Sequence, residues 1–138
     1  MGRLKLDADI LGLGNVMERI TRARVKDCFK DEDTVYFIVG AGELGKAVGK
    51  GGSNIKKVQQ ELGKKIKVIE YRNSLAGFVK NVIFPLKVEE IVEEEGKVKI
   101  KERNKKTKSL LIGREGKNLK LINRAVKRFF NINEVIVE

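Results

Sequence analysis

Two stretches of the sequence, VGKGGSNIK at Val48–Lys56 and IGREGKNLK at Ile112–Lys120, repeat one pattern 64 positions apart. Each has an apolar residue, the motif Gly-x-x-Gly, a spacer that ends in Asn, another apolar residue and a Lys. Two glycines three positions apart carry little information in a chain of 138 residues with 14 glycines. A repeated pattern around them indicates that one structural unit occurs twice. We call Gly49–Gly52 loop 1 and Gly113–Gly116 loop 2.

The repeat continues into the segment that follows each loop. Apolar residues recur there at positions i, i+3 and i+7, which is the spacing of the buried face of an amphipathic helix. They are Ile55, Val58 and Leu62 in the first copy and Leu119, Ile122 and Val126 in the second. Each loop is therefore expected to lie between a short helix and a longer one.

The other elements follow from the alternation of apolar residues and from turn and cap residues. Strands are predicted at Arg24–Lys30, Thr34–Val39, Ile66–Tyr71, Leu86–Val92, Lys97–Lys101 and Glu134–Val137. A first helix is predicted after a cap at Asp7 or Asp9, and its apolar stripe is Ile10, Leu13, Met17 and Ile20. Two further helices run from Ser53 to a cap at Gly63 and from a cap at Ser74 to a point before Pro85. The remaining helices are predicted at Glu43–Val48, Lys108–Ile112 and Lys117–Phe130. The fold class is therefore α+β, with two units that each pack a three-stranded sheet on helices.

Positive charge is concentrated around the two loops. The formal net charge is +11, and the stretch from Lys97 to Arg128 holds 13 Lys and Arg residues against Glu102 and Glu115. The stretch from Lys46 to Lys67 holds seven Lys against Glu61. One basic run can simply be a solvated surface, but two runs that coincide with two glycine loops favour a nucleic-acid partner.

Several functional classes find no support in the composition. Cys28 is the single cysteine, so no disulfide can form within the chain, and a reducing cytoplasmic location is expected. No apolar run reaches the length of about 18–20 residues that a membrane span needs, and the N-terminus has no signal-peptide profile. The chain has no His and no spaced acidic pair, so we expect neither an enzyme, nor a metal site, nor a cofactor.

Two nucleotide-binding motifs overlap just before loop 1. Gly40–Gly45 fits the dinucleotide pattern G-x-G-x-x-G, and Gly40–Lys46 fits most of a P-loop, although Ala47 stands where a hydroxyl would bind magnesium. Both motifs need one long helix after the glycines so that its first amides face phosphate. Loop 1 interrupts that helix after about two turns, which disfavours binding of ATP or NAD.

Both halves resemble KH domains, in which a GXXG loop between two helices clamps the backbone of about four single-stranded nucleotides. Two strands precede each loop and one follows it, which is the order of the prokaryotic-type (type II) KH domain. The resemblance implies a first KH domain at residues 1–72 and a second at residues 73–138, with a linker helix at about 73–84.

The tandem pair is similar to the KH portion of the NusA family, and the short chain resembles its archaeal-type members. VKDCF at Val25–Phe29 and GELGKAVGKGG at Gly42–Gly52 carry this resemblance beyond the loops. It implies binding of nascent single-stranded RNA in transcription elongation, pausing or termination, with RNA polymerase or an elongation complex as a further partner and a monomeric state. A ribosome-associated structural protein is the alternative, since type II KH domains and strong basicity also occur there.

The resemblance also implies which residues contact RNA. The first clamp would be Gly49, Lys50, Gly51 and Gly52, and the second would be Gly113, Arg114, Glu115 and Gly116. Phosphates at the entrances would meet Asn54 and Lys56 in the first copy and Lys117, Asn118 and Lys120 in the second. Glu115 departs from the family pattern, because a carboxylate beside phosphate is repulsive. We therefore expect the second clamp to bind more weakly unless Arg114 and Lys117 offset it.

Overall fold

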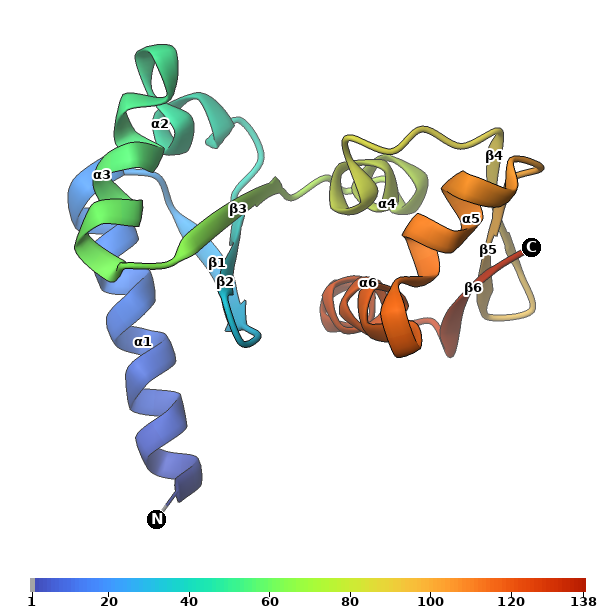
Figure 1. The fold of residues 1–138 in the computed structure, drawn as a ribbon, viewed down its shortest axis with the longest axis horizontal. Coiled ribbons are helices and arrows are strands. Elements are labelled where there is room, and N and C mark those ends of the chain that lie inside the picture. Colours follow the sequence, from blue (N-terminus) through green and yellow to red (C-terminus); the bar gives the residue numbers. More distant parts are fainter. Residues whose placement is uncertain (1) are drawn as a thin grey trace. The chain divides into compact units, whose positions relative to one another are not determined.

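The computed structural model describes the backbone of residues 2–138 and the side chains of residues 12–138. The chain divides into two compact units, Met1–Tyr71 (unit 1) and Arg72–Glu138 (unit 2). Each unit has the element order helix–strand–strand–helix–helix–strand, with a short 3-10 turn between its second and third helices. Figure 1 shows this order along the chain.

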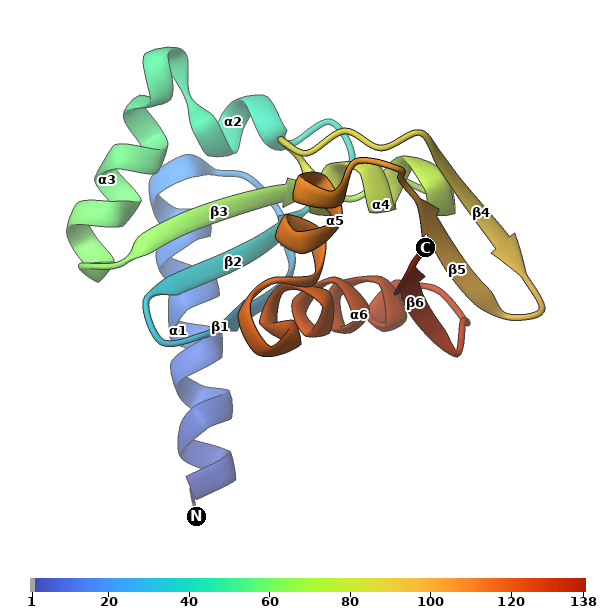
Figure 2. The same cartoon turned by 45° about the vertical axis from the view of Figure 1, so that its right-hand side comes forward.

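Unit 1 is built on a three-stranded sheet whose central strand is β2. Its elements are α1 (Gly2–Thr21), β1 (Val25–Lys30), β2 (Thr34–Val39), α2 (Leu44–Val48), the turn η1 (Lys50–Gly52), α3 (Ser53–Leu62) and β3 (Lys65–Glu70). Strand β2 pairs antiparallel with β1 and parallel with β3. A parallel partner needs a crossover connection, and α2 and α3 supply it. Figure 2 shows the three strands beside one another.

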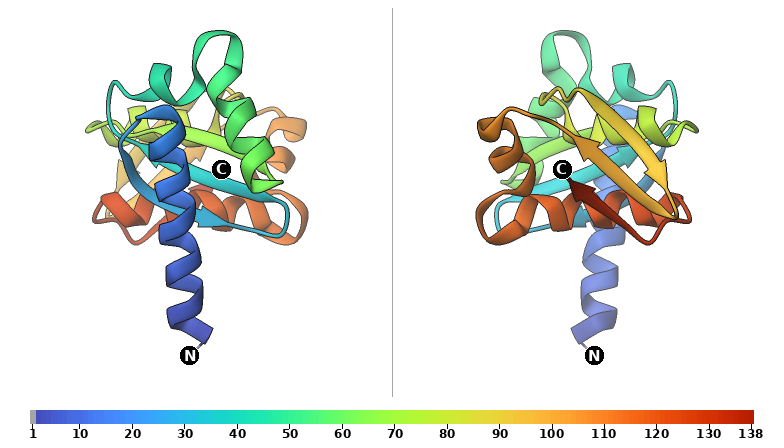
Figure 3. Two further views of the ribbon diagram at one scale, coloured as in Figure 1. Left: turned by 90° about the vertical axis from the view of Figure 1, so that its left-hand side faces the viewer. Right: turned by 90° about the vertical axis from the view of Figure 1, so that its right-hand side faces the viewer.

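The helices of unit 1 cover one face of this sheet. Side chains that alternate along β2 at Val35, Phe37 and Val39 are fully buried against Met17 of α1 and Val58 of α3. The left panel of Figure 3 shows α1 and α3 lying together over that face. This packing fixes the start of α3, and with it the position of loop 1.

Unit 2 repeats the plan with β5 as the central strand. Its elements are α4 (Leu75–Ile83), β4 (Glu90–Glu94), β5 (Lys97–Lys101), α5 (Lys105–Ile112), the turn η2 (Arg114–Gly116), α6 (Lys117–Phe129) and β6 (Glu134–Val137). Strand β5 pairs antiparallel with β4 and parallel with β6. Val98 and Ile100 of β5 are fully buried, as are Leu111 of α5 and Val126 of α6.

The α+β class and the three-stranded sheets are confirmed, and so are several boundaries. The strands at Thr34–Val39, Lys97–Lys101 and Glu134–Val137 have the predicted bounds. Ser74 caps α4 by accepting a hydrogen bond from the Gly77 backbone N–H at 3.1 Å. Gly63 ends α3 in the left-handed region, at φ 65°.

Three predicted elements have boundaries that are wrong by more than one residue. The strand predicted at Leu86–Val92 begins only at Glu90. The two-residue turn at Glu95–Gly96 sets the pairing of β4 with β5, and β5 is only five residues long, so it offers partners to five residues of β4. Helix α5 begins at Lys105 rather than Lys108, because the Asn104 side chain accepts a hydrogen bond from the Thr107 N–H.

Helix α1 is the third case. It begins at Gly2, so Asp7 and Asp9 lie inside it and neither caps its start. Of its predicted apolar stripe, Met17 is fully buried and Leu13 and Ile20 pack against the same core. The side chain of Ile10 lies outside the described residues.

Candidate nucleic-acid interface

The two glycine loops have nearly the same backbone conformation. Their first glycines, Gly49 and Gly113, have φ/ψ of 74°/169° and 76°/172°. Their last glycines, Gly52 and Gly116, have φ/ψ of 76°/14° and 73°/12°. Every one of these φ values lies in the region that only glycine adopts without steric cost. The repeated sequence pattern therefore corresponds to a repeated geometry.

The first glycine of each loop is also required by a close contact. A Cβ at Gly49 would lie 2.7 Å from Cγ of Asn54 and 2.9 Å from its backbone nitrogen. A Cβ at Gly113 would lie 2.8 Å from Cβ of Asn118 and from its backbone nitrogen. At Gly51, Gly52 and Gly116 a Cβ would meet nothing within 4 Å. The loops are thus tightly closed at their first residue and open at the residues that follow.

Asn54 and Asn118 close each loop from the inside. The side-chain amide of Asn54 donates a hydrogen bond to the backbone carbonyl of Lys46 at 2.7 Å. The amide of Asn118 donates to the carbonyls of Leu111 at 2.9 Å and Leu110 at 3.2 Å. The last carbonyls of a helix have no hydrogen-bond partner within the helix. Each Asn lies in the helix after the loop and donates to such a carbonyl of the helix before the loop. This bond holds the two helices at a fixed separation.

The helices after the loops begin without a side-chain cap. Gly52 and Gly116 are the N-caps of α3 and α6, and neither position provides a capping hydrogen bond. By contrast, Ser74 and Asn104 cap α4 and α5 with their side chains. The first N–H of each helix, at Ser53 or Lys117, donates to the Lys50 or Arg114 carbonyl of the preceding turn. The positive end of the helix dipole at these N-termini attracts anions. Glycines beside them let a phosphate approach the main chain.

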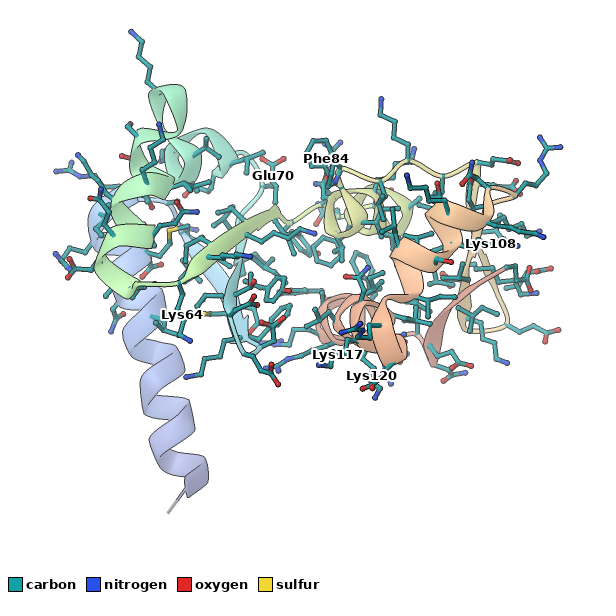
Figure 4. All side chains as sticks on the ribbon, viewed as in Figure 1. Lys64, Glu70, Phe84, Lys108, Lys117 and Lys120 are labelled. Atoms are coloured by element: carbon teal, nitrogen blue, oxygen red, sulfur yellow. The ribbon has the colours of Figure 1, made fainter. Side chains whose placement is uncertain are left out.

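Exposed cations surround both loops. In unit 1 the side chains of Lys50 and Lys56 are exposed. In unit 2 the exposed cations are Arg114, Lys117 and Lys120. Lys117 and Lys120 both belong to the first turn of α6, as Figure 4 shows. Long, solvated cations of this kind bind phosphates mainly by Coulomb attraction and by release of counterions.

Comparisons with known proteins agree with this geometry. The family model described as KH domain matches residues 15–96. The probable transcription termination protein NusA of Methanocaldococcus jannaschii is 31% identical over 99% of this chain and 76% of its own length. This chain belongs to the KH-domain family of NusA-like proteins.

The matches to two other proteins cover nearly the whole chain. The probable transcription termination protein NusA of Thermoplasma acidophilum is 29% identical over all of this chain and 98% of its own length. The crystal structure of APE1850 matches with a TM-score of 0.73 and 33% identity, and the match covers 95% of this chain and 99% of that one. The similarity therefore covers nearly the whole chain in sequence and, for APE1850, also in fold.

Glu115 distinguishes the second loop of this KH-family chain from the first. It has φ 56° and ψ 26°, whereas Gly51 at the same place in loop 1 has φ 62° and ψ 22°. A residue with a Cβ in this region costs roughly 1–2 kcal/mol. The Glu115 side chain is exposed, so its charge stands at the open part of loop 2. Loop 2 keeps the conformation of loop 1 in spite of its sequence.

The helices that precede the loops carry exposed apolar side chains that the sequence analysis did not single out. Leu44 of α2 is 37% exposed, and Leu110 and Ile112 of α5 are 51% and 38% exposed. Apolar residues in short helices are ordinarily assigned to the core, so their sequence positions gave no signal. Their exposure beside the loops makes them candidates for contact with nucleotide bases.

Two kinds of feature are absent from the residues that the structure describes. Among residues that the structure describes, no group of three or more His, Cys, Asp or Glu could hold a metal ion. Within the same part of the chain, none of the helices is both long and apolar enough to cross a membrane.

Proposed function

We propose that this protein binds single-stranded RNA through two tandem type II KH domains, at residues 1–72 and 73–138 with a linker helix at about 73–84. Each GXXG loop clamps the backbone of about four nucleotides. The observation that carries the proposal is the shared conformation of the two loops, each followed by a helix whose N-cap is a glycine. Two clamps on one chain strengthen binding to a strand that is long enough to reach both.

In each clamp the main chain and the cations both contribute to phosphate binding. Phosphate oxygens approach the glycines, where no Cβ stands in the way, and meet the positive N-terminal end of α3 or α6. Asn54 and Asn118 set the width of the clamp through their bonds to the preceding helix. The proposed contact residues are Gly49, Lys50, Gly51, Gly52, Asn54 and Lys56 in the first clamp and Gly113, Arg114, Glu115, Gly116, Lys117, Asn118 and Lys120 in the second.

The relatives point to a role in transcription. Proteins named as probable transcription termination protein NusA match this chain over most of its length. We therefore propose that the RNA is nascent transcript in the cytoplasm, that the protein acts in elongation or termination, and that RNA polymerase or an elongation complex is its protein partner. It acts as a monomeric binding protein, without catalysis and without a cofactor.

A titration of short single-stranded RNA tests the clamps. We compare wild type with the double variants Lys50→Asp with Gly51→Asp and Arg114→Asp with Glu115→Asp. Asp tolerates the left-handed region better than most residues, and a Cβ at Gly51 meets nothing within 4 Å, so the first variant keeps the fold. We expect its affinity to fall by about 10- to 100-fold, since it removes a cation and adds two carboxylates beside phosphate.

The chain offers a matched control for the first variant. Gly63→Asp with Lys65→Asp makes the same charge change at an exposed Lys and at a glycine with φ 65° whose Cβ would also meet open space. A specific clamp predicts a much smaller loss in this control. Unchanged affinity in both loop variants would overturn the proposal.

A co-sedimentation assay separates transcription from the ribosomal alternative. A factor that acts on nascent RNA should leave ribosomal subunits when the salt concentration is raised. Stable, salt-resistant association with ribosomal subunits would contradict the transcription role and would support a structural protein of the ribosome.

A further inference from the structure

The glycine-rich segment Gly40–Gly45 runs into the first turn of α2 and takes no part in the GXXG clamp. It borders a cavity of about 420 Å³ that lies within unit 1. The lining residues lie at or just before the start of β1, in this segment, and just after the end of β3: Arg24, Lys26, Gly40, Ala41, Glu43 and Tyr71. We call this cavity the Tyr71 pocket. Its volume lies in the range of small-ligand sites.

Backbone hydrogen bonds hold the rim of the pocket in place. The Gly40 N–H donates to the Arg24 carbonyl at 2.9 Å, and the Glu43 N–H donates to the Gly40 carbonyl at 3.0 Å. The Gly42 N–H donates to the Glu70 carboxylate at 2.8 Å, with Gly42 at φ 81°. The glycine segment is therefore fixed to both edge strands of the sheet.

The carboxylate of Glu43 is oriented by donors at the rim. It accepts from the Arg24 N–H at 3.0 Å and contacts the Lys46 ammonium at 3.1 Å. The hydrogen bond from Arg24 and then that from Lys46 lower the pKa of Glu43. The negative charge of the Glu43 carboxylate is therefore stabilised by the Arg24 N–H and the Lys46 ammonium.

Tyr71 provides an aromatic surface in the pocket, with cations beside it. The Lys26 ammonium lies 4.5 Å from the centroid of the Tyr71 ring, in a cation–π contact. The side chains of Arg24 and Lys26 are exposed, and the ring is half-buried. An aromatic platform with adjacent cations is the arrangement that binds a stacked base and its phosphate in single-stranded nucleic acid.

We propose that the Tyr71 pocket is a second nucleotide site of unit 1, in which a base stacks on the Tyr71 ring while Arg24 and Lys26 bind the adjoining phosphate. The Lys26 ammonium moves from the ring to the phosphate as the base takes its place. This inference rests on the proposed RNA binding, and it names where the strand goes when it leaves loop 1.

The position of the pocket along the chain fits this path. The glycine segment ends in the first turn of α2, and loop 1 begins where α2 ends. With five residues and a rise of 1.5 Å per residue, α2 is about 7.5 Å long. A strand longer than the four nucleotides of one clamp can therefore extend toward the Tyr71 pocket.

Intrinsic fluorescence provides a direct readout, because the chain has no Trp and only two Tyr. In the variant Tyr36→Phe, Tyr71 is the single tyrosine, so emission excited in the tyrosine absorption band comes from Tyr71. We expect a ten-nucleotide RNA to quench this emission and a four-nucleotide RNA, which the clamp alone can hold, to quench it much less. The same variant is titrated with AMP to detect binding of a free nucleotide.

Affinity measurements on variants complete the test. Tyr71→Leu should weaken binding of the ten-nucleotide RNA by about tenfold and leave the four-nucleotide RNA unchanged, while Tyr71→Phe should bind both as wild type does. Arg24→Ala and Lys26→Ala should also weaken binding of the longer RNA. Lys65→Ala makes the same charge change at the other end of β3 and should have little effect.

The outcomes distinguish this inference from the proposed function. RNA binding that depends on loop 1 but neither quenches Tyr71 nor responds to Tyr71→Leu overturns the inference and leaves the clamps standing. Failure of wild type to bind RNA overturns the proposed function. In that case quenching by AMP would still support a nucleotide site, whereas no quenching by either ligand overturns it.

Discussion

The side-chain amide of Asn54 donates a hydrogen bond to the Lys46 carbonyl at 2.7 Å and so joins α3 to the end of α2 across loop 1. Asn118 makes the equivalent bond to Leu111 at 2.9 Å across loop 2. The same residue type thus performs the same structural task in both copies. The geometry of the loop is thus sufficient to explain why an Asn occurs at this position of both repeats, without any contact to RNA.

Replacing this residue should loosen the loop as well as the fold. We expect Asn54→Ala to lower the free energy of unfolding by about 1–2 kcal/mol, because the Lys46 carbonyl loses its donor. RNA affinity should fall at the same time, since the spacing of the two helices is no longer fixed. Urea denaturation and RNA titration measure the two effects. Asn73→Ala, at an exposed position outside the helices and strands, should change neither quantity by much.

The glycines of loop 1 should differ in their tolerance of a methyl group. Gly49→Ala places a Cβ 2.7 Å from Asn54, whereas Gly51→Ala places one in open space, and both residues have positive φ. We expect Gly51→Ala to cost about 1 kcal/mol of stability from backbone conformation alone. Gly49→Ala should cost clearly more, because Asn54 must move and its bond to Lys46 is strained. Equal thermal destabilisation of the two variants would refute the steric argument.

The charge and the conformation of Glu115 can be separated by two substitutions. Glu115→Gln removes the charge and keeps the Cβ, while Glu115→Gly removes both and recreates the Gly51 position of loop 1. We expect each to raise the affinity for RNA by roughly threefold to tenfold at low salt, and the gain should shrink as salt screens the charge. The reciprocal change Gly51→Glu should lower affinity. If Glu115→Gln left affinity unchanged while Glu115→Gly raised it, backbone strain rather than charge would limit the second clamp.

Much of this arrangement follows from the sequence because the information is local. A glycine pattern that recurs with its apolar frame predicts two loops, and three of the six strands have the bounds that alternation predicts. The role of Asn54 was not predictable in this way. A polar residue beside a glycine loop suggests ligand contact, and only the approach of α2 to α3 shows that its amide is directed to a backbone carbonyl.

The Tyr71 pocket was not predictable because its residues are distant in sequence. Arg24 and Tyr71 come together because β1 runs antiparallel to β2 while β3 runs parallel to it, so the start of β1 and the end of β3 meet at one end of the sheet. The segment Gly40–Gly45 matched a dinucleotide motif, but the sequence alone offered no aromatic partner for it. The late start of β4, at Glu90 and not at Leu86, is a similar case, since the short partner strand β5 limits it.

A pH-dependent pair lies at the β1–β2 turn. The Tyr36 hydroxyl donates to the Asp31 carboxylate at 3.0 Å. Burial and this bond raise the pKa of Tyr36 to about 12. Partial burial alone would raise the pKa of Asp31, but hydrogen bonds from the Thr34 N–H, the Tyr36 hydroxyl and the Asp33 N–H lower it overall from 3.8.

The two shifts set the pH window of the stabilisation. A lowered Asp31 pKa stabilises the folded state above the unfolded value of 3.8, and this contribution is lost as pH falls through the folded pKa. A raised Tyr36 pKa stabilises it below the unfolded value of 10.0, and this contribution is lost as pH rises toward 12. The full contribution is therefore present between about pH 5 and pH 9.

A double-mutant cycle of Tyr36→Phe and Asp31→Asn tests this window. At pH 7 we expect Tyr36→Phe alone to cost about 1 kcal/mol, the usual net value of a hydrogen bond at a partly exposed site. The coupling between the two substitutions should be measurable by urea denaturation at pH 7. It should decline at pH 3, because the unfolded chain protonates Asp31 first, and at pH 11, because the unfolded chain ionises Tyr36 first. Coupling that stays constant from pH 3 to pH 11 would contradict a role for the hydrogen bond between the Tyr36 hydroxyl and the Asp31 carboxylate.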